Sequence, residues 1–283
     1  MLALPLWAED EPSKDNFVLP KAGDIALGID LVPMLGYVGD IFNNTMNNSY
    51  STFGGEPIKN FSTVNNPSVS IMGKYMITDN IAARVNIGIL SNVKYNKAYS
   101  YDDAALLANP LSQAKVEDIR KVKETGASFM LGAEYRRGYK RIQGFGGLNL
   151  IYGYSKKVEN YSYGNALTEV NQTPSRQYAS TLTAPNYWTE RYTVSKYNVG
   201  NNIIGLGAHV GVEVFIISHL SLGGEIFLNG MYEIGSSEYE VMEGYNTLND
   251  KVEEYTELGS PGNNEFIFGT ENLGGKLYMS FYF

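Results

Sequence analysis

Apolar residues occupy every second position in several separate stretches of the chain, most clearly over residues 203–215. The apolar positions there are Ile204, Leu206, Ala208, Val210, Val212 and Val214, and between them lie Gly205, Gly207, His209, Gly211 and Glu213. A period of two puts alternate side chains on opposite faces of a β-strand, whereas a helix would repeat every 3.6 residues. Residues 203–220 are long enough to cross a bilayer as a helix, but this period predicts a strand with one apolar face.

The same alternation recurs along the chain and predicts eight strands of about 10 residues each. They lie near residues 25–31, 69–77, 83–89, 129–136, 148–154, 203–215, 222–228 and 273–283. The short connections fall at 78–80, 138–143 and 217–219, and the long ones at about 38–66, 91–125, 155–200 and 233–268. In the second long connection, the apolar spacing over residues 102–124 predicts a short helix.

Strict alternation of short and long connections is typical of up-and-down barrels in bacterial outer membranes. The predicted fold class is therefore all-β: an eight-stranded antiparallel up-and-down transmembrane β-barrel with short periplasmic turns and four long extracellular loops. A soluble domain would rarely tolerate four such loops.

The composition argues against several kinds of binding site and partner. The chain of 283 residues has 30 acidic and 22 basic side chains, a net charge of −8, two histidines and no cysteine. Disulfides are excluded, and most zinc or iron–sulfur sites are disfavoured. An acidic balance without a basic block argues against nucleic-acid binding. We therefore expect no metal, no cofactor and no nucleic-acid partner.

The beginning of the chain resembles the tail of a secretory signal peptide. Residues 1–8 read MLALPLWA and precede the acidic, proline-containing EDEP, although the basic n-region of a signal peptide is missing. We therefore expect a signal-peptide remnant over 1–8, a polar periplasmic leader over 9–21 and the barrel over 22–283.

The last strand of the chain carries its apolar side chains at alternate positions and finishes on an aromatic residue. These positions are Leu277, Met279, Phe281 and Phe283. This pattern resembles the C-terminal strand by which the assembly machinery recognises bacterial outer-membrane barrels. Residues 74–84 and 220–226 also resemble units of the small OmpX/OmpW/OmpA-type barrels, particularly those of Bacteroidota. The resemblance covers about 22–283 and implies a multi-pass outer-membrane protein that contacts outer-membrane lipid and the barrel-assembly machinery.

A soluble lipocalin-like barrel is the alternative, with its apolar face turned inward. Two features oppose it: charges on the other face near mid-strand, and aromatic residues at the ends of the apolar stripes, as in interfacial girdles. In a membrane barrel those charges face the lumen. The acids are Asp30, Glu134, Glu213 and Glu225, and the bases are Lys74, Arg84, Arg136 and Lys276. A closed salt-bridged core and a narrow polar conduit are both compatible with this set.

We predict no catalytic residues. His209 and Glu213 share the inward face of one strand, but four residues separate them by about 13 Å, too far for a hydrogen bond. No nucleophile elbow or phosphate-binding loop is present. A lone inward histidine is typical of a satisfied lumen group, so a lipid-modifying enzyme is disfavoured.

The long loops carry the candidate partner contacts. These are Tyr161, Tyr163, Tyr187 and Trp188 in the third loop and Glu238, Glu240 and Glu243 in the last. Aromatic residues are enriched at protein interfaces, but the tyrosines could equally be cross-strand packing. The clustered carboxylates of residues 233–257 fit a solvated surface or a divalent cation. We expect a structural or accessory subunit that displays loops in an outer-membrane complex. The alternative is an OmpW-like passive channel for a small or hydrophobic compound.

Overall fold

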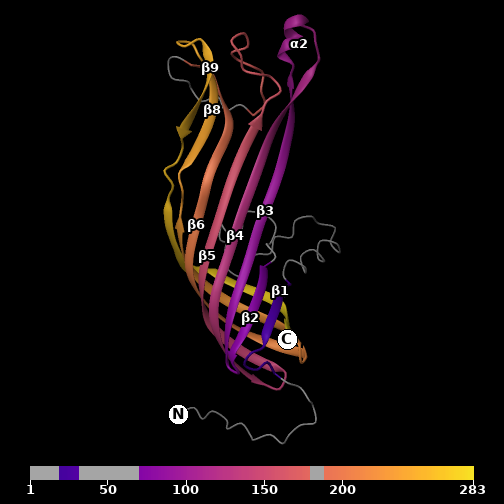
Figure 1. Cartoon of the computed structure of the whole chain (residues 1–283), viewed down its shortest axis with the longest axis vertical. Coiled ribbons are helices and arrows are strands. Elements are labelled where there is room, and N and C mark those ends of the chain that lie inside the picture. Colours follow the sequence, from indigo (N-terminus) through magenta and orange to yellow (C-terminus); the bar gives the residue numbers. More distant parts are fainter. Residues whose placement is uncertain (1–18, 32–69, 179–187) are drawn as a thin grey trace, which may run out of the picture.

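Eight strands close into an antiparallel β-barrel in the computed structural model, which describes residues 19–31, 70–178 and 188–283 (Figure 1). The barrel strands are β1 (Ile25–Asp30), β2 (Ser70–Thr78), β3 (Ile81–Tyr101), β4 (Lys115–Tyr139), β5 (Ile142–Ser162), β6 (Trp188–Ile217), β7 (Leu220–Ile234) and β10 (Asn264–Tyr282). β1 pairs with β2 on one side and with β10 on the other, and this last pairing closes the ring. The predicted eight-stranded antiparallel β-barrel is confirmed, and each predicted stretch of alternation overlaps one of these strands.

The side chains of the barrel strands alternate between an apolar exterior and a polar interior. In β2, Ile71, Tyr75 and Ile77 are exposed, whereas Lys74 and Met76 are buried. The same division runs through the described barrel portion of each of these strands, and the exposed face is the apolar one. The outward side chains of these strands therefore form one continuous surface, which we call the apolar belt. Its exposed aliphatic and aromatic members include Leu27, Ile87, Phe129, Leu131, Leu148, Leu150, Leu206, Val210, Ile226 and Leu277.

Three tight turns lie at one end of the barrel, where the predicted short connections fall. They leave residues 79–80, 140–141 and 218–219 between paired strands, and Lys140 takes a left-handed φ of 54°. Inside this end, Ala26, Phe215 and Tyr282 pack together with Leu19. The chain finishes at the same end (Figure 1). That this end is periplasmic stays a prediction, and the expected signal-peptide remnant (1–8) lies outside the described residues.

At the other end, β3 to β6 continue far beyond the barrel as a tall curved wall (Figure 1). β6 has 30 residues; Asn202–Ile217 pair with β7 in the barrel, and Trp188–Asn198 pair with β8 (Glu238–Asn246). β9 (Lys251–Leu258) forms a hairpin with β8. We call residues 91–101, 115–125, 155–162 and 188–200, together with β8 and β9, the upper sheet.

The upper sheet corrects two sequence-based predictions. Strands of about 10 residues were expected, yet most of the predicted loops over 91–125, 155–200 and 233–268 prove to be strand where they are described. The cause is that both faces of these strand ends lie outside the apolar belt, so no alternation marks them. The predicted loop over 38–66 lies outside the described residues.

The predicted helix over 102–124 is wrong for most of its length. The helix α2 covers only Asp103–Ala108, with Asp102 as its N-cap, and β4 begins at Lys115. From Lys115 onward the chain pairs with β3, and from Ile119 it also pairs with β5. These backbone hydrogen bonds override a helix-like spacing that mixes residues from both faces of a strand. Among the described residues, no helix is long and apolar enough to cross a membrane.

Candidate functional site

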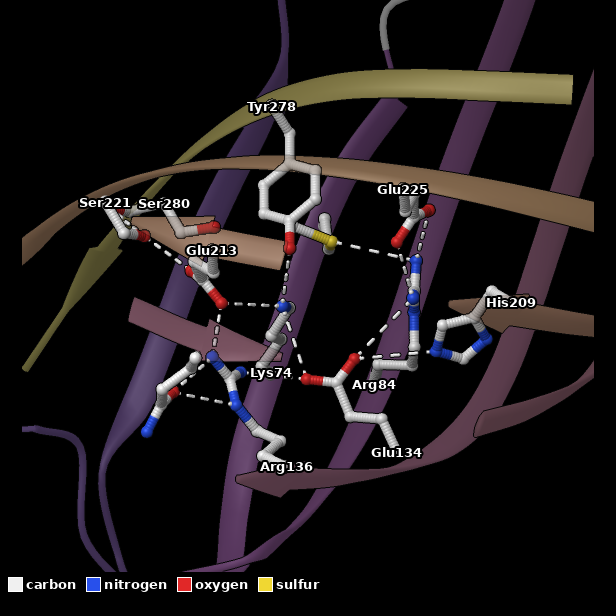
Figure 2. Close-up of polar contacts among 12 residues, drawn as sticks. Lys74, Arg84, Glu134, Arg136, His209, Glu213, Ser221, Glu225, Tyr278 and Ser280 are labelled. Carbon is white, nitrogen blue, oxygen red and sulfur yellow. Dashed lines mark hydrogen bonds and ion pairs between the residues drawn. The ribbon is translucent and has the colours of Figure 1, made fainter. Parts of the chain in front are cut away.

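Charged side chains from five strands meet inside the barrel (Figure 2). β2 supplies Lys74, β3 Arg84, β4 Glu134 and Arg136, β6 Glu213, and β7 Glu225. We call these six residues the ion cluster. They occupy inward positions because each strand turns its apolar side chains outward to the belt. All six are buried, and three acids balance three bases.

The part of the ion cluster nearest the tight turns is built around Arg136. Its guanidinium donates to Glu134 at 2.8 Å, to Gln143 Oε1 at 2.7 Å and to the Tyr282 hydroxyl at 2.9 Å, and it also donates to Glu213. The Tyr282 hydroxyl in turn donates to Glu213 at 3.0 Å. The arginine therefore links β4, β5, β6 and β10 across the lumen.

Lys74 occupies the centre of the cluster. Its Nζ lies 3.3 Å from a carboxylate oxygen of both Glu134 and Glu213, and it donates to the Tyr278 hydroxyl at 3.1 Å. The same nitrogen lies 4.8 Å from the ring centroids of Phe145 and Tyr278. Lys74 is thus enclosed by two carboxylates and two aromatic rings.

Arg84 and Glu225 form the third part of the cluster with a bidentate pair of 2.8 and 2.9 Å. Arg84 also lies 3.6 Å from Glu134, which connects this pair to the rest. His209 Nε2 is 3.6 Å from the same Glu134 carboxylate, and its Nδ1 contacts Asn149 at 3.0 Å. Because every charge has a partner, the cluster avoids the penalty of several kcal/mol expected for an unpaired buried ion.

Asp30 and Lys276, the two remaining predicted lumen charges, adjoin the ion cluster, because Lys276 is opposite Glu225 in the register of β7 and β10. Their side chains are 3.9 Å from each other and only partly buried. Between them and the tight turns, the described lumen holds the cluster and the buried aromatic residues Phe145, Tyr278, Phe215 and Tyr282. Farther up, the side-chain oxygens of Asn86, Asn149 and Asn229 are buried with no hydrogen-bond partner among the described residues.

Above the barrel, residues 163–178 fold back onto the upper sheet; we call them the cap segment. Asp118 of β4 accepts hydrogen bonds from the Gly164 amide at 2.9 Å and the Gln177 amide at 2.8 Å. Asp103 accepts from the Ser175 amide at 2.9 Å and from Asn171 Nδ2 at 2.8 Å. The Asp118 carboxylate therefore holds both ends of the cap segment by hydrogen bonds, and the Asp103 carboxylate holds residues between them.

Arg176 is the central side chain of the cap segment. It pairs with Glu243 of β8 at 2.6 Å, and its guanidinium lies 4.0 Å from the ring centroid of Tyr163 and 4.4 Å from that of Tyr192. Beside it is a hollow of about 280 Å³. Its lining residues include Tyr161, Tyr163, Leu167, Arg176, Val194 and Glu243.

Two ionisable groups near this hollow are perturbed by their surroundings. Burial and the hydrogen bond to Glu159 raise the pKa of Tyr161 to about 12. Burial opposes ionisation of Glu159, but hydrogen bonds from Tyr161, Arg120 and Lys157 outweigh it and lower the pKa of that carboxyl. At neutral pH the tyrosine is therefore neutral and the glutamate charged.

The acidic segment 233–257 is mostly the β8–β9 hairpin, and its carboxylates bind neighbouring side chains. Glu240 pairs with Lys196 at 2.7 Å, Glu257 with Arg191 at 3.0 Å, and Glu243 with Arg176. Glu238 is half-buried at the start of β8. In the described part of the chain, no group of three or more His, Asp or Glu side chains could hold a metal ion.

The aromatic candidates divide between the upper sheet and the cap segment. Tyr161 and Tyr163 stack with ring centroids 6.3 Å apart beside the cap segment, whereas Trp188 contacts Tyr255 of β9 at 5.1 Å. Tyr187 lies outside the described residues. In the last strand, Leu277, Phe281 and Phe283 are exposed on the apolar belt and Met279 is half-buried.

The neutral side chains that hydrogen-bond to the ion cluster were not singled out from the sequence. Tyr278, Tyr282, Ser221 and Gln143 hydrogen-bond the buried charges, and the parity of their strands was the available signal. No sequence pattern pointed to Arg176 or Asp118. The cap segment has no regular secondary structure, and the residues that contact these two side chains are distant from them in the sequence.

An apolar exterior around a fully paired, charged interior is the reverse of a water-soluble barrel. This distribution defines the class of membrane-spanning β-barrels. No protein-family model matches the chain, and no curated protein sequence matches it. Among solved structures it is similar to the outer membrane protein OprG from Pseudomonas aeruginosa, with 9% sequence identity and a TM-score of 0.33. That similarity covers 94% of this chain and 98% of OprG. Because a TM-score of this size does not establish a shared fold, the class assignment rests on the geometry of this chain alone.

Proposed function

We propose that the chain is a non-enzymatic barrel of the bacterial outer membrane that holds the upper sheet outside the cell for contact with other outer-membrane proteins. The observation that carries this proposal is a set of paired, buried charges across the lumen beneath a wall of continuous strands. β3, β4, β5 and β6 contribute to the barrel and run without interruption into the upper sheet. The barrel is then a rigid base, and the upper sheet is the working surface.

The ion cluster supports an anchor rather than an open pore. Its side chains are at most 4% exposed, and the pairs join strands on opposite sides of the lumen. To open a path, a solute would have to separate several buried ion pairs, each expensive to break. Below it, Ala26, Phe215 and Tyr282 pack together inside the turn end of the barrel.

The upper sheet supports a role in protein contact because it presents aromatic and charged side chains on a preformed scaffold. Interfaces are enriched in tyrosine, tryptophan and arginine. The candidate contacts Tyr161, Tyr163 and Trp188 are half-buried, so each has surface left to bury against a partner.

The outward placement of the upper sheet can be tested by cysteine labelling, since the chain has no cysteine of its own. Leu111→Cys places a thiol in the exposed turn beyond α2, and Ser218→Cys places one in the β6–β7 turn. On intact cells, a membrane-impermeant maleimide should label the first variant and not the second. Labelling of Ser218→Cys alone would place the upper sheet in the periplasm and overturn the proposal.

Gentle detergent extraction of the native membrane, native gel electrophoresis and mass spectrometry test the accessory role. Stoichiometric co-migration with other outer-membrane proteins is expected. Migration as a lone barrel contradicts the partner role.

A passive channel for a small or hydrophobic compound is the second candidate. The unpartnered oxygens of Asn86, Asn149 and Asn229 favour it, because buried amide oxygens of this kind usually bind water and would line a polar vestibule above the ion cluster. Planar-bilayer recording separates the two functions: open-channel steps support the channel, and a silent bilayer supports the anchor.

A further inference from the structure

A group of lysines lies on the outward face of the upper sheet, just beyond the apolar belt. Lys121 and Lys123 are in β4, and Lys156 is in β5. The pairing of β4 with β5 has no register shift. Alternate residues therefore continue to face outward from the belt into the upper sheet. Lys121 and Lys123 share a parity with Phe129 and Leu131, whereas Lys156 shares one with Leu148 and Leu150.

The strand registers place the three lysines next to one another. Thr125 is opposite Lys156, and Lys123 is opposite Val158, so Lys123 and Lys156 are diagonal neighbours about 7–8 Å apart. Lys121 precedes Lys123 by two residues and lies about 7 Å farther along the strand, away from the belt. Tyr95 is opposite Lys121, and the Lys121 ammonium lies 5.5 Å from its ring centroid.

The height of this patch matches the headgroup region of a bilayer. On β5, Lys156 comes two residues after the exposed Tyr154, about 7 Å along the strand. On β4, Lys123 comes four residues beyond Ala127, the residue opposite both Ile89 and Tyr154. Because strands in such barrels tilt by about 35–45°, Lys156 and Lys123 lie roughly 5–10 Å above the level of Ala127 and Tyr154, and Lys121 lies about 5 Å higher. The polar layer is about 5–8 Å deep, so the backbone of this patch begins within that layer and extends just above it.

This patch is positively charged, whereas the protein as a whole is acidic. The chain as a whole carries −8, yet among the described residues no acid makes an ion pair with Lys121, Lys123 or Lys156. Glu124 and Glu159 have the opposite parity and so lie on the other face, and Glu159 there binds Arg120 and Lys157. Glu117, which shares the outward parity, pairs with Lys97 at 2.6 Å.

We propose that Lys121, Lys123 and Lys156, with Tyr95, bind the phosphate groups of a phosphorylated glycolipid in the outer leaflet of the membrane. Lysine ammoniums bind phosphate as flexible point charges, and their aliphatic stems lie along apolar surface while the charge reaches the headgroups. Tyrosines are favoured at the same depth. The inference rests on the proposed outward placement of the upper sheet.

The test uses the full chain refolded in a non-ionic detergent and titrated with diphosphorylated lipid A, with phosphate-free lipid A as the second ligand. The patch variant is K121Q/K123Q/K156Q. The matched control is K94Q/K157Q/K196Q, which removes the same charge from the upper sheet. Lys94 and Lys157 have the opposite parity to the patch, so they lie on the other face of the upper sheet. Lys196 is on that face too, because it is opposite Glu159. Heat-dependent gel mobility verifies that each variant is folded.

The wild-type chain should bind the diphosphorylated lipid about tenfold or more tightly than the patch variant, since the variant loses three charges that attract an anionic surface. The control should stay within about twofold of wild type. The wild-type affinity should fall as salt rises, and the phosphate-free lipid should bind all three proteins alike. Equal losses in both variants, or equal wild-type binding of the two lipids, would overturn the inference.

These outcomes are independent of the tests of the proposed function. Binding in detergent requires neither a partner protein nor a membrane orientation, so loss of the lipid site leaves the anchor proposal standing. Labelling of Ser218→Cys on intact cells overturns the outer-leaflet assignment while leaving the measured phosphate affinity unchanged.

Discussion

In the ion cluster, the Arg84 and Glu225 side chains are 1% and 4% exposed, whereas in the upper sheet those of Lys196 and Glu240 are 42% and 21% exposed. The two pairs have almost the same separation, 2.8 and 2.7 Å. Their contributions to stability nevertheless differ, because one pair is buried and the other is partly exposed. Exposed pairs contribute about 0–1 kcal/mol, because water screens them, whereas breaking a buried pair costs about 3–5 kcal/mol.

The comparison also separates two ways of organising a structure. The cluster joins residues that are distant in sequence, such as Arg84 and Glu225 with a separation of 141 positions. Its loss should affect the whole barrel at once. The upper sheet and cap segment are held by many smaller contacts between adjacent strands, so they should loosen locally.

The largest expected effect comes from removing one side of a buried pair. Arg84→Met leaves Glu225 without its bidentate partner, and we expect it to lower the free energy of unfolding by about 3–5 kcal/mol. Glu225→Met should cost less, because Arg84 still has Glu134 at 3.6 Å. Urea unfolding of the refolded barrel in lipid vesicles, followed by gel mobility, measures both.

The double variant Arg84→Met/Glu225→Met is the control for this prediction. Replacing both partners by apolar side chains removes the charge together with its counter-charge, so much of the lost stability should return. Additive losses in the double variant would show that the pair does not act as a unit, and the cluster could then not be treated as a charge-balanced seal.

The amino-acid sequence predicts the two regions unequally, for a physical reason. Within the apolar belt every outward residue meets lipid, so Ile204, Leu206 and Val210 reveal both the strand and its inward face. The eight strands, their tight turns and the inward position of Lys74 or Glu213 could therefore be predicted. The partners could not, because the pairing of Arg84 with Glu225 depends on how the whole ring closes.

In the upper sheet both faces lie outside the belt, and the alternation disappears. Residues 91–101 and 115–125 consequently resembled a loop, and Val116, Ile119 and Val122 resembled one face of a helix although they lie in β4. Arg176 and Asp118 make their main contacts with residues of the cap segment, β6 or β8, and no local sequence pattern indicates such contacts.

An intermediate effect is expected from Arg176, whose side chain is buried like those of the ion cluster but belongs to the cap segment above the barrel. Its side chain is 2% exposed and joins Glu243, Tyr163 and Tyr192. Arg176→Ala should loosen the cap segment by roughly 1–3 kcal/mol while leaving the unfolding of the barrel unchanged. Hydrogen exchange of the Gln177 amide and urea unfolding provide the two measurements.

Arg176→Lys serves as the matched variant, since it keeps the charge near Glu243 but loses the planar group between the two tyrosines. Protection of the cap segment should fall between wild type and Arg176→Ala. A shift of the global unfolding midpoint in either variant would contradict the division between a cooperative barrel and a locally held cap.

The smallest expected effect is a pH response confined to the cap segment. Burial raises the pKa of the Asp103 carboxyl, but hydrogen bonds from Asn171 and Ser175 outweigh it, so the folded pKa lies below its usual value. A folded pKa below the unfolded one means that the contribution of Asp103 is complete above about pH 4 and is lost as pH falls through the folded pKa. Because Asp103 is partly exposed, screening keeps this contribution below about 1 kcal/mol.

The Ser175 amide reports this change directly, because it donates to Asp103 at 2.9 Å. Its NMR resonance should titrate with a midpoint below that of an ordinary aspartate, and Asp103→Asn should abolish the titration. The Arg84–Glu225 pair, enclosed in the barrel, should keep the barrel folded over the same range. A midpoint at or above the ordinary value would mean that the hydrogen bonds to Asp103 do not favour its charged form, and the cap segment would then depend on Asp118 and Arg176 alone.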